Sequence, residues 1–106
     1  MGNRFGGFAG GGNMQAMMRQ AQKMQQDAMR AKEEIESTVF EGSASGGLVK
    51  VEINGKYDMI SIKIDPAVVD DDVEMLEDLI VASFNDAKAK ADEMKNNKLG
   101  AFGGLL

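Results

Sequence analysis

The middle of the chain carries the alternation of apolar and polar positions that is typical of half-buried strands. The run from Leu48 to Ile53 has a valine or an isoleucine at every second position, and a second run from Lys56 to Ile64 has isoleucine at positions 60, 62 and 64. A period of two predicts two strands. Asn54 and Gly55 lie between them and tolerate the positive φ of a two-residue type I′ turn, so we expect a hairpin.

Two regions flank these strands with apolar residues at steps of three and four, which predicts two amphipathic helices. The last helix runs from about Asp72 to Asn96, and Asp71 and Glu74 have the spacing of a capping box. The first follows the N-cap Asn13 and runs from Met14 to about Glu36. Its apolar positions have the a/d spacing of a coiled-coil seam: Met14, Met17, Ala21, Met24, Ala28, Ala31 and Ile35.

The remaining segments complete an α+β fold. Ser37–Glu41 is β-rich and predicts a first strand, and Gly42–Gly47 predicts a small, mobile linker. The expected fold is a long N-terminal helix, a three-stranded antiparallel β-meander and a long C-terminal helix. Residues 1–12 contain six glycines, which indicates a flexible arm. We therefore expect one domain over residues 13–98, with that arm before it and a second Gly-rich tail at residues 99–106.

Composition argues against an enzyme. The chain has 106 residues and neither cysteine nor histidine, so it lacks thiolate ligands and the usual general base. Ser43 and Ser45 have no partner for nucleophilic catalysis, and the Gly-rich linker lacks the P-loop pattern. We expect no cofactor. We also expect no metal, because an acidic cluster lacks EF-hand spacing and is explained by helix capping: Asp70, Asp71, Asp72, Glu74, Glu77 and Asp78.

The charge is negative overall but unevenly distributed. A net charge of −5 does not favour nucleic acid. However, Arg19, Lys23 and Arg30 share one stripe of the first helix, away from the seam. This stripe suits phosphate contacts, and it equally suits a solvated face with Asp27 and Glu33 as ion-pair partners. Four lysines lie near the end of the last helix, where they also complement the helix dipole: Lys88, Lys90, Lys95 and Lys98.

The sequence predicts a protein that stays in the cytoplasm. It contains no run of about 18 apolar residues that would span a bilayer, and its first residues lack the apolar segment of a secretory signal. We expect no membrane partner and no small-molecule substrate.

Three stretches together resemble a known family. LVKVEINGKYDMISIKIDP followed by DDDVEMLEDLIVASFNDA is similar to the core of the YbaB/EbfC family of nucleoid-associated proteins, and MQAMMRQAQKMQQ resembles the first helix of that family. The resemblance implies a small bacterial protein of the cytoplasm and nucleoid. It also implies a tweezer-like homodimer that binds double-stranded DNA and influences chromosome organisation and gene expression.

The resemblance also implies candidate sites. The sheet region would form the dimer body, and the dimer interface would contain Val49, Val51, Ile53, Ile60, Ile62, Leu76, Ile80 and Phe84. The helices would project and face DNA with Arg19, Lys23, Arg30, Lys88, Lys90, Lys95 and Lys98. Contacts of lysine and arginine with phosphate would make binding salt-sensitive, with modest base discrimination.

An alternative is a protein-interaction adaptor of replication or recombination factors, for which DNA binding is incidental. The Met/Ala seam and the acidic start of the last helix favour this second hypothesis. It predicts that reversing the charge of the basic stripe leaves association with DNA intact.

Overall fold

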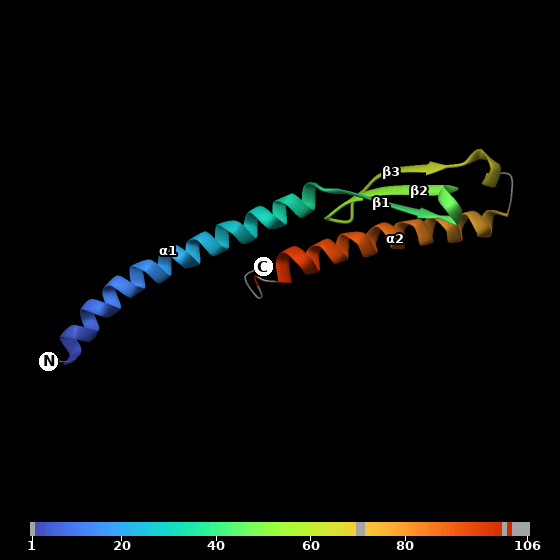
Figure 1. Ribbon diagram of the computed structural model, residues 1–106. Helices are drawn as coiled ribbons and strands as arrows, with labels where there is room; N and C mark the ends of the chain where they lie inside the picture. Colours follow the sequence, from blue (N-terminus) through green and yellow to red (C-terminus); the bar gives the residue numbers. More distant parts are fainter. Residues whose placement is uncertain (1, 70–71, 101, 103–106) are drawn as a thin grey trace.

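The protein is an elongated α+β molecule in the computed structural model, with principal extents of 85 × 17 × 16 Å. The structure describes residues 2–69, 72–100 and 102, with side chains from residue 13 onward. A long helix, three strands and a second long helix follow one another along the chain. In Figure 1, α1 projects from one end of a narrow body formed by the sheet and α2. The predicted order of elements is confirmed.

Helix α1 spans Gly2–Ser37 and is the longest element. Its composition from Met14 onward is rich in alanine, glutamine, methionine and glutamate, which favour helix. At its C-terminal end, the hydroxyls of Ser37 and Thr38 donate to the backbone carbonyls of Glu33 (3.0 Å) and Glu34 (2.5 Å), respectively. The start differs from the predicted start at Met14, which rested on Asn13 as the N-cap. The division into arm, domain and tail stays a prediction.

The sheet is an antiparallel meander of β1 (Val39–Ala44), β2 (Val49–Asn54) and β3 (Met59–Ile64), with β2 in the centre. The predicted meander is therefore confirmed. β1 starts later and ends later than predicted, because the small residues 42–44 continue the strand. Residues 45–48 form the connection to β2, with a 3₁₀ turn at Ser45–Gly47 whose three residues all have positive φ. The predicted mobile linker over Gly42–Gly47 is wrong for its first half.

Gly42 lies within β1, and its lack of a side chain lets α2 approach the strand closely. It pairs with Val51 of β2, and a Cβ built on Gly42 would lie only 2.1 Å from the carbonyl oxygen of Ser83 and 2.4 Å from the amide nitrogen of Ala87. Any side chain at this position would push the helix off the sheet. The glycine therefore serves close packing rather than chain flexibility.

The connection between β2 and β3 covers residues 55–58, and Asn54 and Asp58 close it. The amide of Tyr57 donates to the carbonyl of Asn54 (2.9 Å), and the amide of Asn54 donates to the carbonyl of Asp58 (3.0 Å). Positive φ falls on Tyr57 (68°), not on Asn54 or Gly55. The predicted two-residue type I′ turn is therefore wrong. The Asn54 side chain accounts for the difference, since its Oδ1 accepts from the amides of Lys56 (2.8 Å) and Asp58 (3.1 Å).

Gly55 also contributes to the contact by which α1 packs on the body. A Cβ on Gly55 would lie 2.2 Å from the carbonyl oxygen of Ile35, whose side chain is fully buried. Close by, Lys98 of the second long helix donates to Glu34 at 2.5 Å. These contacts fix the direction in which α1 leaves the body.

Helix α2 spans Val73–Leu99 and follows the N-cap Asp72, whose carboxylate accepts from the amide of Glu74 at 3.0 Å. This is the local signal expected of an N-cap. The capping box predicted at Asp71 falls on a residue outside those that the structure describes. A short 3₁₀ turn, Pro66–Val68, connects β3 to this region, and its first amides are capped by Asp65.

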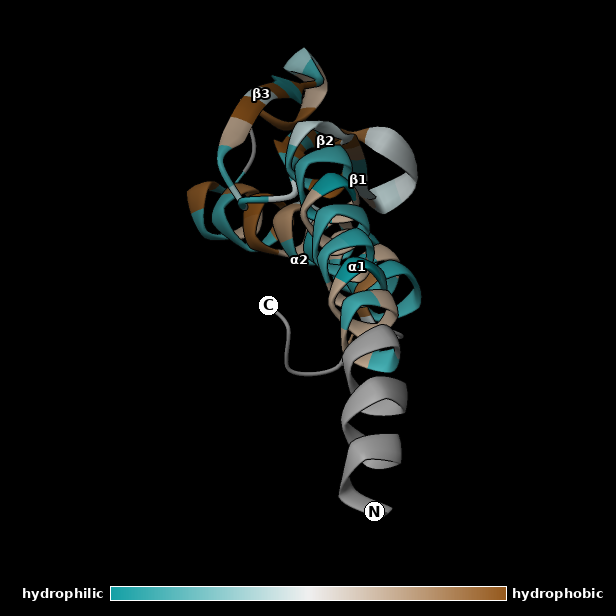
Figure 2. Ribbon diagram, turned by 90° about the vertical axis from the view of Figure 1, so that its left-hand side faces the viewer, coloured by the Kyte–Doolittle hydropathy of each residue, from teal (hydrophilic) through white to brown (hydrophobic). Residues whose placement is uncertain are grey.

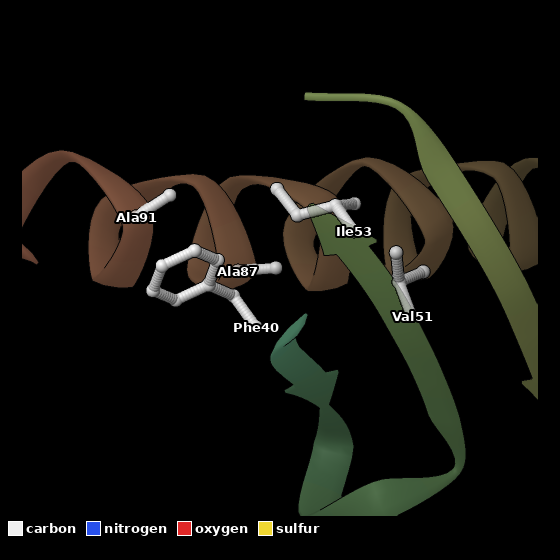
Figure 3. Close-up of a cluster of buried hydrophobic side chains, with 5 residues drawn as sticks. All are labelled: Phe40, Val51, Ile53, Ala87 and Ala91. Carbon is white, nitrogen blue, oxygen red and sulfur yellow. The ribbon is translucent and has the colours of Figure 1, made fainter. Parts of the chain in front are cut away.

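The core lies between α2 and the inner face of β1 and β2. Phe40, Val51 and Ile53 from the strands pack against Ala87 and Ala91 of α2 (Figure 3). Small residues on the helix allow the two layers to approach closely. A second cluster, formed by Val49, Val68 and Leu79, continues the core toward the start of α2. The predicted apolar face of β2 is therefore the face that is buried.

Candidate nucleic-acid interface

The basic stripe of α1, formed by Arg19, Lys23 and Arg30, lies on the helix that projects from the body (Figure 1). All three residues are exposed. Within the part of the chain that the structure describes, neither Arg19 nor Lys23 forms an ion pair, and Arg30 has only a 4.0 Å contact with Asp27. The stripe therefore presents cations whose charges are almost unopposed. Glu33, the other expected ion-pair partner, makes no ion pair within the same described part.

The lysines of α2 have a different environment, because each contacts a group of its own chain. Lys88 forms an ion pair with Asp92 (3.1 Å). Lys95 places its Nζ 3.7 Å from the centre of the Tyr57 ring, which is a cation–π distance. The Tyr57 hydroxyl in turn donates to Asp92. The turn after β2 is thus fastened to α2 by one connected polar cluster.

This cluster changes the acid–base properties of two of its members. The hydrogen bond from the Tyr57 hydroxyl, followed by that from Lys88, lowers the pKa of Asp92 below its usual value. The hydrogen bond to Asp92 and the attraction of its charge raise the pKa of Lys88. Both shifts favour the charged forms, so the ion pair persists throughout the neutral pH range.

Lys90 and Lys98 point to other partners. Lys90 donates to the carbonyl oxygen of Glu41 at 2.7 Å and lies 3.8 Å from Asp86. Asp86 also accepts from the amide of Ser43 at 3.0 Å, so these two α2 side chains cap the free edge of β1. Lys98 pairs with Glu34 of α1. The four predicted α2 lysines therefore do not form one patch.

Sequence reasoning missed the partners that occupy these lysines. Asp92 and Asp86 each stand four residues from their lysine, and this spacing, visible in the sequence, is the signal that could have found them. Tyr57 had no comparable signal, because it reaches α2 only through the fold. The role of each basic residue in DNA binding stays a prediction.

The predicted dimer-interface residues fall into two groups. Val49, Val51 and Ile53 are fully buried within the single chain, so they have no surface to offer a partner unless the core opens. Ile60 and Ile62 of β3 are 53% and 39% exposed. Ile62 pairs with Val51 and shares its face of the sheet. It remains exposed because α2 packs on β1 and β2 rather than on β3.

Helix α2 adds half-buried residues to the same side of the molecule. Leu76, Ile80 and Phe84 recur every four residues beside the buried stripe of α2 and pack against the edges of the two core clusters. In Figure 2, apolar segments of β3 and of the first part of α2 lie on one side of the body. We call this set the open apolar surface: Ile60, Ile62, Leu76, Ile80 and Phe84.

Neither a metal centre nor a membrane span is found in the described part of the chain. Among its residues, no group of three or more acidic side chains is placed to hold a metal ion. None of its helices combines the length and the apolar character needed to cross a bilayer.

The fold and this site define a class of protein: a small α+β body with a projecting helix that carries an exposed basic stripe. The model of the YbaB/EbfC DNA-binding family matches residues 10–106. The chain therefore belongs to the YbaB/EbfC DNA-binding family. Membership in a family defined by DNA binding agrees with the prediction that the chain is not an enzyme.

Similar proteins agree with this assignment. A nucleoid-associated protein of Pelotomaculum thermopropionicum is 47% identical over 97 residues, covering 91% of this chain and 92% of that protein. One from Acetivibrio thermocellus is 49% identical over 106 residues, with 94% of each chain covered. The crystal structure of an uncharacterized protein from Helicobacter pylori has the same fold, with a TM-score of 0.69 at 20% identity over 83% of this chain and 94% of that one.

Proposed function

We propose that the chain is a nucleoid-associated protein that binds duplex DNA as a homodimer, through phosphate contacts from projecting helices. It acts in the cytoplasm, at the nucleoid, and influences chromosome organisation and gene expression. Family membership supports binding to DNA, and the names of the relatives support the location. The observation that carries the binding mode is the basic stripe of α1, whose cations are almost unopposed on a helix that leaves the body.

The α1 stripe contributes more to binding than the α2 lysines. A phosphate that approaches Lys88, Lys90 or Lys98 competes with a carboxylate already in contact, and Lys95 must leave the Tyr57 ring. Arg19 and Lys23 have no such interactions to give up within the described residues. Phosphate contacts orient a protein on DNA without reading sequence, so we expect modest base discrimination.

The open apolar surface forms the dimer interface. Exposed apolar side chains on β3 and half-buried ones on α2 lie on one side of the body, and a contiguous surface of this kind marks a protein contact. Both α1 helices project in the same direction only if the twofold axis runs along the long axis of the chain. That arrangement gives the tweezer shape, with the body at one end and two α1 helices at the other.

The test compares two triple variants of equal charge change. Arg19→Gln/Lys23→Gln/Arg30→Gln removes the α1 stripe, and Lys50→Gln/Lys56→Gln/Lys63→Gln removes three lysines from the sheet and the loop after β2. Fluorescence anisotropy with a labelled duplex is measured at several salt concentrations, after light scattering has established the oligomeric state. The slope of log K against log[salt] should fall by about 0.9 for each phosphate that the variant no longer neutralises.

We expect the α1 variant to bind weakly with a smaller slope, and the sheet variant to bind nearly as wild type. Equal weakening in both would mean that overall charge, not the stripe, governs binding. Unchanged binding of the α1 variant would refute the proposed interface and favour the adaptor hypothesis. A chain that is monomeric at all concentrations would refute the homodimer.

A further inference from the structure

The seam of α1 is covered at one end and uncovered at the other. Ala28 and Ile35 are buried, whereas Met14, Met17 and Met24 on the same stripe are exposed, Met17 to 65%. The cause is length: α1 pairs with α2 near its C-terminal end, where Lys98 donates to Glu34, and Figure 1 shows α1 running well past the end of α2. The stretch Met14–Met24, which we call the outer seam, therefore continues a buried interface and has no partner among residues 13–69, 72–100 and 102.

The outer seam is complementary to itself in one orientation. Its four seam positions are Met14, Met17, Ala21 and Met24. Antiparallel pairing of two copies places Met14 opposite Met24 and Met17 opposite Ala21, and it keeps the a-to-d′ matching that antiparallel coiled coils require. A large side chain then meets a small one at Ala21, which is how facing helices fill the space between them.

A parallel in-register pair fits less well. It would set Met17 against Met17 and Ala21 against Ala21, which crowds one layer and leaves a gap in the next. It would also hold Arg19 and Lys23 of the two copies at the same height along the pair. The antiparallel arrangement leaves the two copies of Arg19 level at the centre of the pairing, but it separates the two copies of Lys23 along the axis.

The positions beside the outer seam carry no charge. Asn13, Met18, Gln20 and Gln25 flank it, so two copies approach without repulsion between like charges. The basic stripe lies on the opposite side of the helix, since Arg19 and Lys23 follow the seam positions Met17 and Ala21 by two residues each. Pairing through the outer seam therefore leaves the stripe open to DNA.

We propose that the outer seam is a self-association surface that joins α1 of one copy to α1 of another in antiparallel orientation. The assignment of the two paired helices to different dimers rests on the proposed homodimer. The two α1 helices within one tweezer run parallel, so an antiparallel pair of α1 helices must link two different dimers, end to end. Each dimer keeps its own basic stripes. A linked pair of dimers therefore holds two duplexes, or two distant parts of one duplex.

The association is weak in the absence of DNA. Met14 to Met24 spans about 15 Å of helix, and an interface of this length falls below the roughly 1,200 Å² typical of stable complexes. DNA raises the effective concentration of the α1 ends by holding many dimers side by side, so association is expected to strengthen on a long duplex.

Two methionines of α1 provide a matched pair of variants. Met24 lies in the outer seam and is 46% exposed, whereas Met29 lies off the seam and is 47% exposed. Met24→Glu and Met29→Glu make the same chemical change at the same exposure on the same helix. Only the first buries a carboxylate in the proposed interface, which is unfavourable without a partner.

The first measurement is sedimentation velocity of the full chain over a wide concentration range, alone and on a long duplex. We expect wild type and Met29→Glu to shift from dimer to tetramer as concentration rises, and Met24→Glu to associate at least about tenfold more weakly. Equal behaviour of the two variants would overturn the proposal. So would a wild-type chain that remains dimeric both free and on DNA.

The second measurement determines the relative orientation of the two paired α1 helices. Because the chain has no cysteine, each introduced cysteine is the only thiol that can form a disulfide. Met17→Cys and Ala21→Cys variants are purified separately and oxidised alone or mixed. Antiparallel pairing brings residue 17 of one copy within disulfide reach of residue 21 of another, so cross-linked chains should form only in the mixture. Cross-linking of Met17→Cys alone would indicate parallel pairing and refute the proposal.

The two experiments separate this inference from the proposed function. A dimer that binds DNA without forming tetramers or mixed cross-links would leave the proposed function standing and refute the self-association surface. A monomeric chain would refute the homodimer, and the mixed cross-link would still decide whether the outer seam pairs, since it requires only two copies.

Discussion

Replacing Gly42 with alanine tests the close approach of α2 to β1. The added methyl carbon would lie 2.1 Å from the carbonyl oxygen of Ser83 and 2.4 Å from the amide nitrogen of Ala87. Both atoms belong to the backbone of a long helix, so neither can turn aside as a side chain would. The helix or the strand must move as a unit.

The size of the movement sets the cost. Ordinary van der Waals separation begins near 3.4 Å, so the gap beside Gly42 must widen by about 1.3 Å. A gap of about 1 Å already forfeits about half of the dispersion attraction of the atoms that line it. Overpacking a core costs about 1–3 kcal/mol. Because rigid backbone is displaced, we expect a loss of about 3 kcal/mol, the upper end of that range.

The assay is thermal unfolding followed by circular dichroism, with all variants at the same protein concentration. A loss of about 3 kcal/mol should lower Tm by about 12–24 °C in a domain of this size. Gly100→Ala is the control, since a Cβ on Gly100 meets nothing within 4 Å, and it should leave Tm nearly unchanged. A Tm of Gly42→Ala equal to that of the control would refute the close-packing argument.

Other predictions concern the core, the loop between β2 and β3, and the contact between that loop and α1. Ile53→Ala should lower the free energy of unfolding by about 2–5 kcal/mol in urea titrations, whereas Val39→Ala, at an exposed site, should change it by less than about 0.5 kcal/mol. Tyr57→Phe removes the hydroxyl that lowers the pKa of Asp92, so NMR titration should find that pKa nearer its ordinary value of 3.8. A lowered carboxyl pKa stabilises the fold above the unfolded pKa, and this stabilisation is lost as pH falls through the folded pKa. When the pH is lowered below about 4, the stability of the Tyr57→Phe variant should therefore fall by less than the stability of wild type does. Gly55→Ala should speed hydrogen exchange in the last turn of α1 more than in β2.

Periodicity predicted the elements that bury an apolar face. The alternation in β2 and the three-and-four spacing in α2 and in the C-terminal part of α1 are consequences of burial on one side, so a single sequence reveals them. The ends of elements were predicted less well where a residue has a role set by distant parts of the chain. Gly42 was interpreted as linker because glycine is common in loops, whereas its function depends on Ser83 and Ala87.

The positions of the basic side chains were predictable on α1 and less so on α2, and their role in binding stays a prediction. The basic stripe of α1 could be found because its three residues share one helix face. The environment of the α2 lysines depends on Tyr57, Glu34 and the edge of β1, which approach α2 only after folding. The exposure of Ile60 and Ile62 likewise depends on how far α2 extends across the sheet, which the alternation of β3 does not report.

The close contact between Gly55 and Ile35 lies near the C-terminal end of α1 and is the fulcrum about which this long helix would tilt. At 1.5 Å per residue, the 36-residue helix is about 54 Å long, so a tilt of roughly 10° at the fulcrum displaces the far end by about 9 Å. A shift of atoms at the fulcrum that is too small to disturb the sheet thus changes the reach of the helix by about half the width of a DNA duplex. Substitutions at the contact between Gly55 and Ile35 can therefore change the position of the far end of α1 without lying near it.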